Sequence, residues 1–241
     1  MTATRRAIVF GGGRLGRWAL DDIRPDDLLV GADRGAAFLV RHGLHPAAAI
    51  GDFDSVDAAT RERIRRQSGV FLDCDPVDKD RTDLEMALDW VLELAVGGTS
   101  EGTTENAVDP RIGEIELRGA TGTRLDHTLA NIFLLRRPVL RGVDAALRDA
   151  TNRVRLAVPG RPVTVTRGPY RYVSLLPLAG EARGVTLAGF KYPLENAVLV
   201  AGSTLSVSNE LAAETGTVIV AEGELLVVES RDGPVRKGVR P

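Results

Sequence analysis

The sequence has little cysteine, little lysine and no long apolar run. Its single cysteine, Cys74, excludes an internal disulfide and a metal site built from several cysteines, and it fits a reducing compartment. No run is apolar enough to cross a bilayer, and the first residues lack the apolar core of a signal peptide. The formal charge of −2 gives no bulk attraction to nucleic acid or membrane. We therefore expect a cytoplasmic protein that binds neither.

The stretch of residues 51–55, Gly-Asp-Phe-Asp-Ser, is the first that suggests chemistry. Residues 47–50 read as a short buried strand, which Gly51 ends, and Asp52 and Asp54 follow two residues apart. Alternate side chains of extended backbone share a face, so this spacing predicts two carboxylates pointing at one ion. Magnesium commonly takes one or two carboxylates and fills its octahedron with water and substrate phosphates. The stretch therefore predicts a magnesium ligand pair.

The stretch of residues 79–85, Lys-Asp-Arg-Thr-Asp-Leu-Glu, is the second. Thr82 and Glu85 have the spacing of a capping box, and an apolar stripe from Leu84 to Ala95 predicts the helix that follows. Asp83 then lies in the first turn, beside free N–H groups that attract phosphate. Lys79 is one of only three lysines, which favours a specific role for it.

A simpler interpretation of these two stretches stays open. Asp-x-Asp pairs are common in loops, and an acidic residue in a first helical turn stabilises the helix dipole without any function. Either stretch taken alone is more often structural than catalytic. Their occurrence together with a third element favours a functional site.

The third element is the turn at residues 119–127. Glycines end the predicted strand 114–118, and Arg124, Asp126 and His127 precede a predicted helix. An arginine in such a turn suits a fork-like grip on phosphate. Alternatively, Arg124 and Asp126 pair and cap the helix, and His127 is a helix-start residue.

The first half of the chain alternates strands and helices, which predicts an α/β domain with a parallel sheet. Strands at 7–10 and 28–33 surround a glycine-rich turn, and Asp33 ends the second of them. Ligands of such sheets bind outside the carboxyl ends of the strands. From residue 152 onward, short strands alternate with Gly and Pro turns, which is typical of an all-β sandwich or barrel. The predicted domains are residues 1–150 and 151–241.

The three stretches, in this order and followed by Leu129-Ala130-Asn131, resemble the thiamine pyrophosphokinase family. The resemblance continues in residues 172–177, 189–194 and 207–210, so it covers nearly the whole chain. Members of that family transfer a pyrophosphoryl group from ATP to thiamine, giving thiamine diphosphate and AMP. The resemblance implies a homodimer that uses Mg²⁺ and binds ATP through the first domain and thiamine through the second.

The resemblance also implies roles for individual residues. Asp52, Asp54 and Asp83 would hold the metal, and one of these or Asp80 would accept the proton of the thiamine hydroxyl. Residues that would bind ATP or thiamine are Lys79, Thr82, Arg124, Asp126, His127, Asp33, Ser55, Ser206, Ser208 and Asn209. Without the family, residues 206–209 read as a polar turn between strands.

Two alternatives remain at this point. A pyrophosphokinase that acts on a pterin alcohol would need the same aspartates. A nucleotide-binding module without catalysis would keep the fold, although the presence of every expected carboxylate disfavours it.

Overall fold

A computed structural model describes residues 4–74, 80–95 and 112–233 of the protein. The chain forms two compact units, Met1–Asp149 (unit 1) and Ala150–Pro241 (unit 2). None of the described helices is long and apolar enough to span a membrane.

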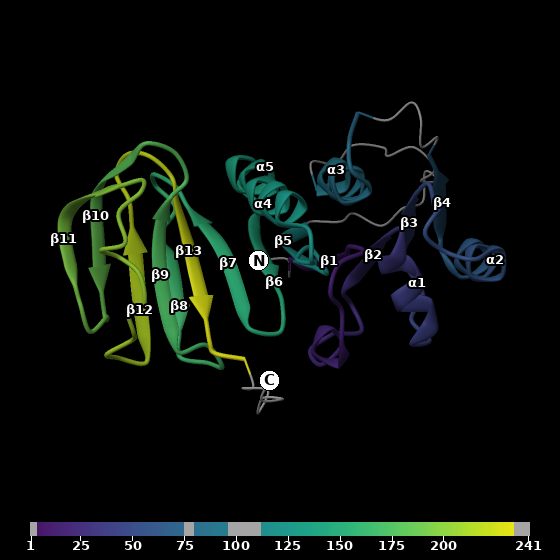
Figure 1. The fold of residues 1–241 in the computed structure, drawn as a ribbon, viewed down its shortest axis with the longest axis horizontal. Helices are drawn as coiled ribbons and strands as arrows, with labels where there is room; N and C mark the ends of the chain where they lie inside the picture. The colour runs from purple at the N-terminus through teal and green to yellow at the C-terminus, as the bar shows by residue number, and fades with distance from the viewer. Residues whose placement is uncertain (1–3, 75–79, 96–111, 234–241) are drawn as a thin grey trace, which may run out of the picture. The chain divides into compact units, whose positions relative to one another are not determined.

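Unit 1 is built on a parallel sheet with the strand order β4-β3-β2-β1-β5-β6 (Figure 1). The strands are β1 (Arg5–Phe10), β2 (Leu28–Ala32), β3 (Ala48–Gly51), β4 (Val70–Asp73), β5 (Ile112–Arg118) and β6 (Asp144–Arg148). β1, β2 and β3 are buried along nearly their whole length, as expected for near-continuous apolar strands covered on both faces. The sequence-based prediction of an α/β fold with a parallel sheet is confirmed.

The described residues of unit 1 form five α-helices. They are α1 (Arg34–Arg41), α2 (Ala58–Gln67), α3 (Asp83–Ala95), α4 (Leu125–Leu134) and α5 (Arg136–Leu140). Figure 1 shows α1 and α3 on opposite sides of the central strands. A short 3-10 helix, η1 (Arg17–Ala19), follows the glycine-rich turn.

The order of the strands creates a switch point between β1 and β5. From β1 the chain adds β2, β3 and β4 on one side, and it then returns to place β5 on the other side of β1. At such a point the loops that follow neighbouring strands diverge and leave a crevice at the carboxyl edge of the sheet. The fold itself therefore indicates where a ligand of unit 1 binds.

Unit 2 is a sandwich of antiparallel strands. One layer contains β7 (Asn152–Ala157), β13 (Leu225–Ser230) and β9 (Tyr172–Pro177), with β13 between the other two. The second layer has the order β11 (Leu194–Val200), β10 (Glu181–Ala188), β12 (Thr215–Ile219) and β8 (Val163–Thr166). Alternate residues of these strands form one apolar core, which includes Val165, Leu175, Val185, Val218 and Val227. The prediction of an all-β module is thus confirmed as a sandwich.

Candidate active site

A pocket of about 620 Å³ lies at the switch point of unit 1. Residues of the loop after β1 and of the loop after β5 form its floor. These two loops run side by side, and Gly13 N–H donates a hydrogen bond of 2.8 Å to the Gly119 carbonyl oxygen. A side chain at Gly13 would place Cβ 2.2 Å from the Thr121 carbonyl oxygen, so only glycine allows this approach. The glycine-rich turn therefore shapes the pocket floor by bringing two backbones together.

The pocket collects most of the residues that the sequence predicted for unit 1. The predicted residues in its lining are Asp33, Asp80, Thr82, Asp83, Arg124 and His127. They come from three separate loops, each of which follows a strand or precedes a helix. Lys79 lies outside the described residues, so its predicted role is untested.

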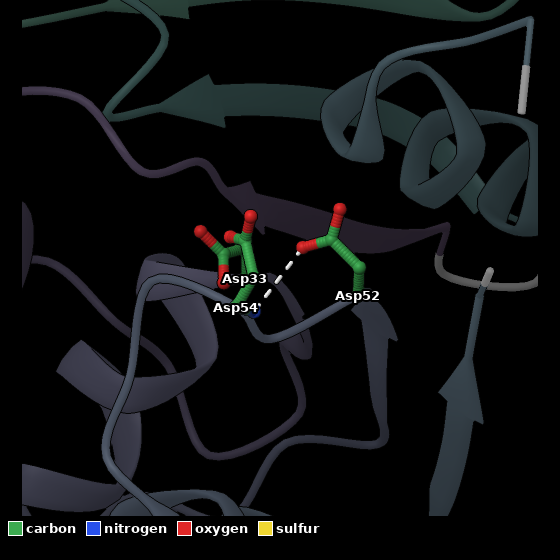
Figure 2. A group of neighbouring side chains, drawn as sticks. All are labelled: Asp33, Asp52 and Asp54. Carbon is green, nitrogen blue, oxygen red and sulfur yellow. Dashed lines mark hydrogen bonds between the residues drawn. The ribbon is translucent and has the colours of Figure 1, made fainter. Parts of the chain in front are cut away.

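Asp33, Asp52 and Asp54 form an acidic group at one side of this region. One carboxylate oxygen from each residue lies within 4.8 Å of the others, and Figure 2 shows the three side chains converging from two loops. Ser55 Oγ donates a hydrogen bond of 2.6 Å to Asp33 Oδ2, whereas Asp33 Oδ1 is buried without a hydrogen-bond partner. Three like charges at this distance repel one another, which is the arrangement a bound cation relieves.

The backbone of the acidic turn differs from the expected one. The prediction that Asp52 and Asp54 share a face because the backbone is extended is wrong, since Phe53 between them has φ +52°. The two carboxylates come close through a left-handed residue, and Asp54 N–H donates to Asp52 Oδ1 at 3.2 Å across the turn (Figure 2).

These residues suit a magnesium ion. All three offer hard oxygen atoms, and the buried, unpartnered Asp33 Oδ1 is an atom that a cation would satisfy. Among the described residues the acidic group contains Asp33 in addition to the predicted pair, whereas Asp83 lies in the pocket lining. The metal-ligand role of Asp83 stays a prediction.

The start of α3 provides a site for an anion. Thr82 Oγ1 accepts a hydrogen bond of 3.2 Å from Glu85 N–H, as the capping box predicted, and Asp83 lies in the first turn. The Glu85 carboxylate pairs with Arg137 at 2.6 Å. Arg81 is directed to Asp89 at 2.9 Å. Residues 81–84 line the pocket, so the positive end of the α3 dipole lies beside it and favours a phosphate there.

Arg124 and Asp126 form an exposed pair before α4. Arg124 Nη2 lies 2.5 Å from Asp126 Oδ2, so the side-chain hydrogen bond from Arg124 lowers the pKa of the Asp126 carboxyl, and the same bond raises the pKa of Arg124. This pairing agrees with the alternative interpretation of the sequence, in which Arg124 and Asp126 pair with each other. Arg124 also lines the pocket, whereas Asp126 does not.

In unit 2, Asn209 is a buried side chain with three hydrogen bonds. Its Oδ1 accepts from the N–H groups of Tyr192 at 3.2 Å and Glu210 at 2.8 Å, and its Nδ2 donates to the Tyr192 carbonyl oxygen at 2.8 Å. The Tyr192 side chain is 70% exposed, so Asn209 fixes the backbone of an outward-facing aromatic residue.

The two serines beside Asn209 are also bound within the sandwich. Ser206 Oγ donates to the Leu175 carbonyl oxygen at 2.7 Å. Ser208 has φ +63°, and its N–H donates to Ser174 Oγ at 3.0 Å. Their predicted contacts with thiamine stay predictions.

Comparison with known proteins identifies the family. Residues 22–147 match the family model "Thiamin pyrophosphokinase, catalytic domain", and residues 162–225 match "Thiamin pyrophosphokinase, vitamin B1 binding domain". The chain is 37% identical over 205 residues to the thiamine pyrophosphokinase of Bacillus subtilis strain 168, covering 85% of this chain and 88% of that protein. The chain belongs to the thiamine pyrophosphokinase family.

Solved structures of thiamine pyrophosphokinases have the same fold. The enzyme from Bacillus subtilis superposes with a TM-score of 0.80 at 32% identity, covering 95% of this chain and 100% of that chain. The enzyme from Geobacillus thermodenitrificans gives 0.75 at 34% identity, covering 95% and 99%. The pterin and non-catalytic alternatives are not favoured by these matches to thiamine pyrophosphokinases.

Sequence reasoning missed two residues of unit 1 that shape the site of this family member. Asn131 lines the pocket, and its Nδ2 donates to the Ala120 carbonyl oxygen at 2.8 Å, which holds the loop after β5. Its position seven residues after Arg124, two helical turns along the same face, was the available signal.

Arg118, at the end of β5, is the second missed residue. Its side chain is fully buried and contacts Glu116 at 2.6 Å and Asp22 at 2.8 Å, while its backbone carbonyl accepts from Gly11 N–H at 2.7 Å. Burial opposes the charge of Asp22, but Arg118, Arg148 and Arg6 outweigh it and lower its pKa to about 2. This charge network anchors the strand end from which the pocket floor begins.

Proposed function

We propose that this protein transfers the pyrophosphoryl group of ATP to the hydroxyl oxygen of thiamine, giving thiamine diphosphate and AMP. The observation that carries the proposal is one pocket at the switch point of a parallel sheet, lined by Asp33 of the acidic group, the start of α3 and Arg124. The volume of about 620 Å³ suits a nucleotide. Membership of the family supports the choice of thiamine as acceptor.

The proposed reaction breaks the bond between the β-phosphorus and the oxygen that stays with AMP. The thiamine hydroxyl oxygen forms the new bond to the β-phosphorus, and its proton passes to a carboxylate. Because little covalent chemistry falls to the protein in such transfers, catalysis rests on positioning and on neutralising the phosphate oxygens. Arg124 and the first turn of α3 supply that neutralisation, with Lys79 as a further predicted cation.

Asp33, Asp52 and Asp54 would hold Mg²⁺, with Asp83 as the predicted further ligand. The ion supplies charge neutralisation on the triphosphate when it is bound. The proton acceptor is one of Asp52, Asp54, Asp83 and Asp80. A carboxylate that does not ligate the metal is the better base, because a bound cation lowers its proton affinity.

We assign thiamine to the surface of unit 2 around residues 206–209. Tyr192 supplies an exposed aromatic face, which suits a cationic ring because the face of an aromatic ring attracts positive charge. Asn209 acts here by fixing Tyr192 and Glu210, since its own polar atoms already have partners. Ser206 and Ser208 border the same turn.

We further propose that the protein is a cytoplasmic homodimer. Leu125, Leu129 and Phe133 are exposed large apolar residues spaced by four along α4. Such a stripe is typical of a helix face that another chain covers. Sedimentation equilibrium of the purified protein should give twice the mass of the chain, and a monomer at micromolar concentration would contradict the dimer.

The test of the function is product analysis with ATP, Mg²⁺ and thiamine. We expect AMP and thiamine diphosphate in equal amounts, and neither product when Mg²⁺ is omitted. A hydroxymethylpterin added at equal concentration should neither react nor compete. AMP without thiamine diphosphate, or a pyrophosphorylated pterin, would overturn the proposed acceptor.

A further inference from the structure

The turn between β3 and α2 has an unusual backbone. Among the described residues other than glycine, only four have a positive φ. Two of them are Asp33 at +46°, a member of the acidic group, and Phe53 at +52°, which lies between the other two members. A left-handed conformation is costly for an aromatic residue because Cβ approaches the carbonyl oxygen. Some other interaction must hold Phe53 in this state.

Burial of the Phe53 side chain is that interaction. The side chain is 2% exposed, and its ring stacks on Phe71 with centroids 4.7 Å apart and an interplanar angle of 17°. The same apolar cluster contains Ala36, Ala37, Val40, Ala49 and Ile64, from α1, β3 and α2. Arg65 in turn lies over the Phe71 ring at 4.5 Å.

The packing around the turn is uneven. An open groove of about 510 Å³ lies beside it, with Phe53, Asp54 and Arg61 in its lining. The turn is therefore not packed against α2 on every side. The buried Phe53 ring anchors the turn to α1, α2 and β4.

The conformation of Phe53 decides where its two neighbours point. Asp52 and Asp54 lie on either side of it, and their carboxylates meet that of Asp33 within 4.8 Å (Figure 2). A change of φ at residue 53 would rotate Asp54 and the residues after it relative to Asp52 and the residues before it. The bond from Asp54 N–H to Asp52 Oδ1 would then be lost as well.

We infer that Phe53 is a positioning residue for the divalent cation, whose buried ring holds the left-handed turn that brings Asp54 to Asp33 and Asp52. The inference rests on the proposed function, because that proposal supplies the cation. Phe53 itself contacts neither cation nor substrate. Phe53 affects cation binding only by setting the directions in which the Asp52 and Asp54 side chains point.

The test compares Phe53→Leu with Ile64→Val. Ile64 is a fully buried member of the same cluster on α2, but it lies outside the turn. Mn²⁺ is titrated into each purified protein without ATP or thiamine, and free Mn²⁺ is measured by its electron paramagnetic resonance signal. The Mg²⁺ concentration for half-maximal turnover and the KM for thiamine are measured on the same samples.

We expect Phe53→Leu to weaken Mn²⁺ binding about tenfold or more, because substitution of residues that orient metal ligands commonly has an effect of this size. The half-saturating Mg²⁺ concentration should rise in parallel, with the KM for thiamine little changed. Ile64→Val should bind Mn²⁺ like the wild type. If Phe53→Leu fails to fold, Phe71→Leu removes the stacking partner and should give a smaller loss in the same direction.

The possible results separate the two claims. Equal Mn²⁺ affinity in wild type and the Phe53 variant, or an equal loss in both Phe53→Leu and Ile64→Val, overturns the positioning role while the cation site stands. A wild-type protein that binds no Mn²⁺ overturns the proposed cation site and the positioning role with it.

Discussion

Replacing Asp33 by asparagine should stabilise the protein while it removes activity. Asp33 has one carboxylate oxygen within 4.8 Å of those of Asp52 and Asp54, and at that distance each repulsive pair costs about 1 kcal/mol in water and about 3.5 kcal/mol at an effective dielectric constant of 20. Because Asp52 is half-buried and Asp54 exposed, the lower figure applies. Loss of two pairs then gives about 2 kcal/mol.

The Asp33→Asn side chain fits the site in other respects. Its oxygen can still accept the hydrogen bond from Ser55 Oγ, and asparagine tolerates a positive φ better than most residues. For a domain of this size, 1 kcal/mol corresponds to about 2–4 °C in Tm, so we expect a rise of about 4–8 °C in EDTA.

Differential scanning calorimetry in EDTA and in Mg²⁺, together with turnover, is the assay for this variant. Mg²⁺ should raise the Tm of the wild type more than that of the variant, and turnover should fall about 100-fold. A variant that is less stable than the wild type in EDTA and keeps its turnover would refute the argument, because Asp33 would then be a structural cap.

The remaining predictions concern both units. Asp83→Asn should lower turnover about 100-fold with an unchanged circular dichroism spectrum, and near wild-type turnover would remove Asp83 from the site. Asn209→Ala should cost about 2–4 kcal/mol in urea unfolding, since three hydrogen bonds of a buried amide are lost, and a loss below about 1 kcal/mol would contradict this. Tyr192→Ala should raise the KM for thiamine with little change in stability, and an unchanged KM would exclude the proposed aromatic contact. The pKa of Asp22 is about 2 against an ordinary 3.8, so its ion pairs stabilise the fold above pH 4 and this contribution is lost as the pH falls toward 2. Asp22→Asn should therefore be less stable at pH 7 and lose less stability than the wild type between pH 4 and 2, whereas parallel pH profiles would count against the network.

The sequence predicted β1, β2, β3 and β5 and the helices α3 and α4, whereas β4, β6, α2 and α5 were not predicted. The runs that became β1, β2 and β3 are apolar along their length, and α3 has both a capping threonine and an apolar stripe. Parallel pairing then places their carboxyl ends at one edge, so a shared site was foreseeable.

The sequence could not predict the details that depend on tertiary packing. Left-handed backbone at Phe53 is unfavourable locally and is stabilised by residues of α1, α2 and β4. The burial of Arg118 depends on Asp22, which is 96 residues away in the chain. The family resemblance implied that Asn209 contacts thiamine, which stays a prediction, and only the fold shows that its amide is bound to Tyr192 and Glu210.

The central claim is pyrophosphoryl transfer at this pocket, and isotope transfer tests it most directly. The purified protein is incubated with thiamine, Mg²⁺ and ATP labelled at either the α- or the γ-phosphate. We predict that the γ label appears in thiamine diphosphate and the α label only in AMP. Label from the γ-phosphate in thiamine monophosphate, with ADP as the second product, would contradict attack at the β-phosphorus and the function proposed for this chain.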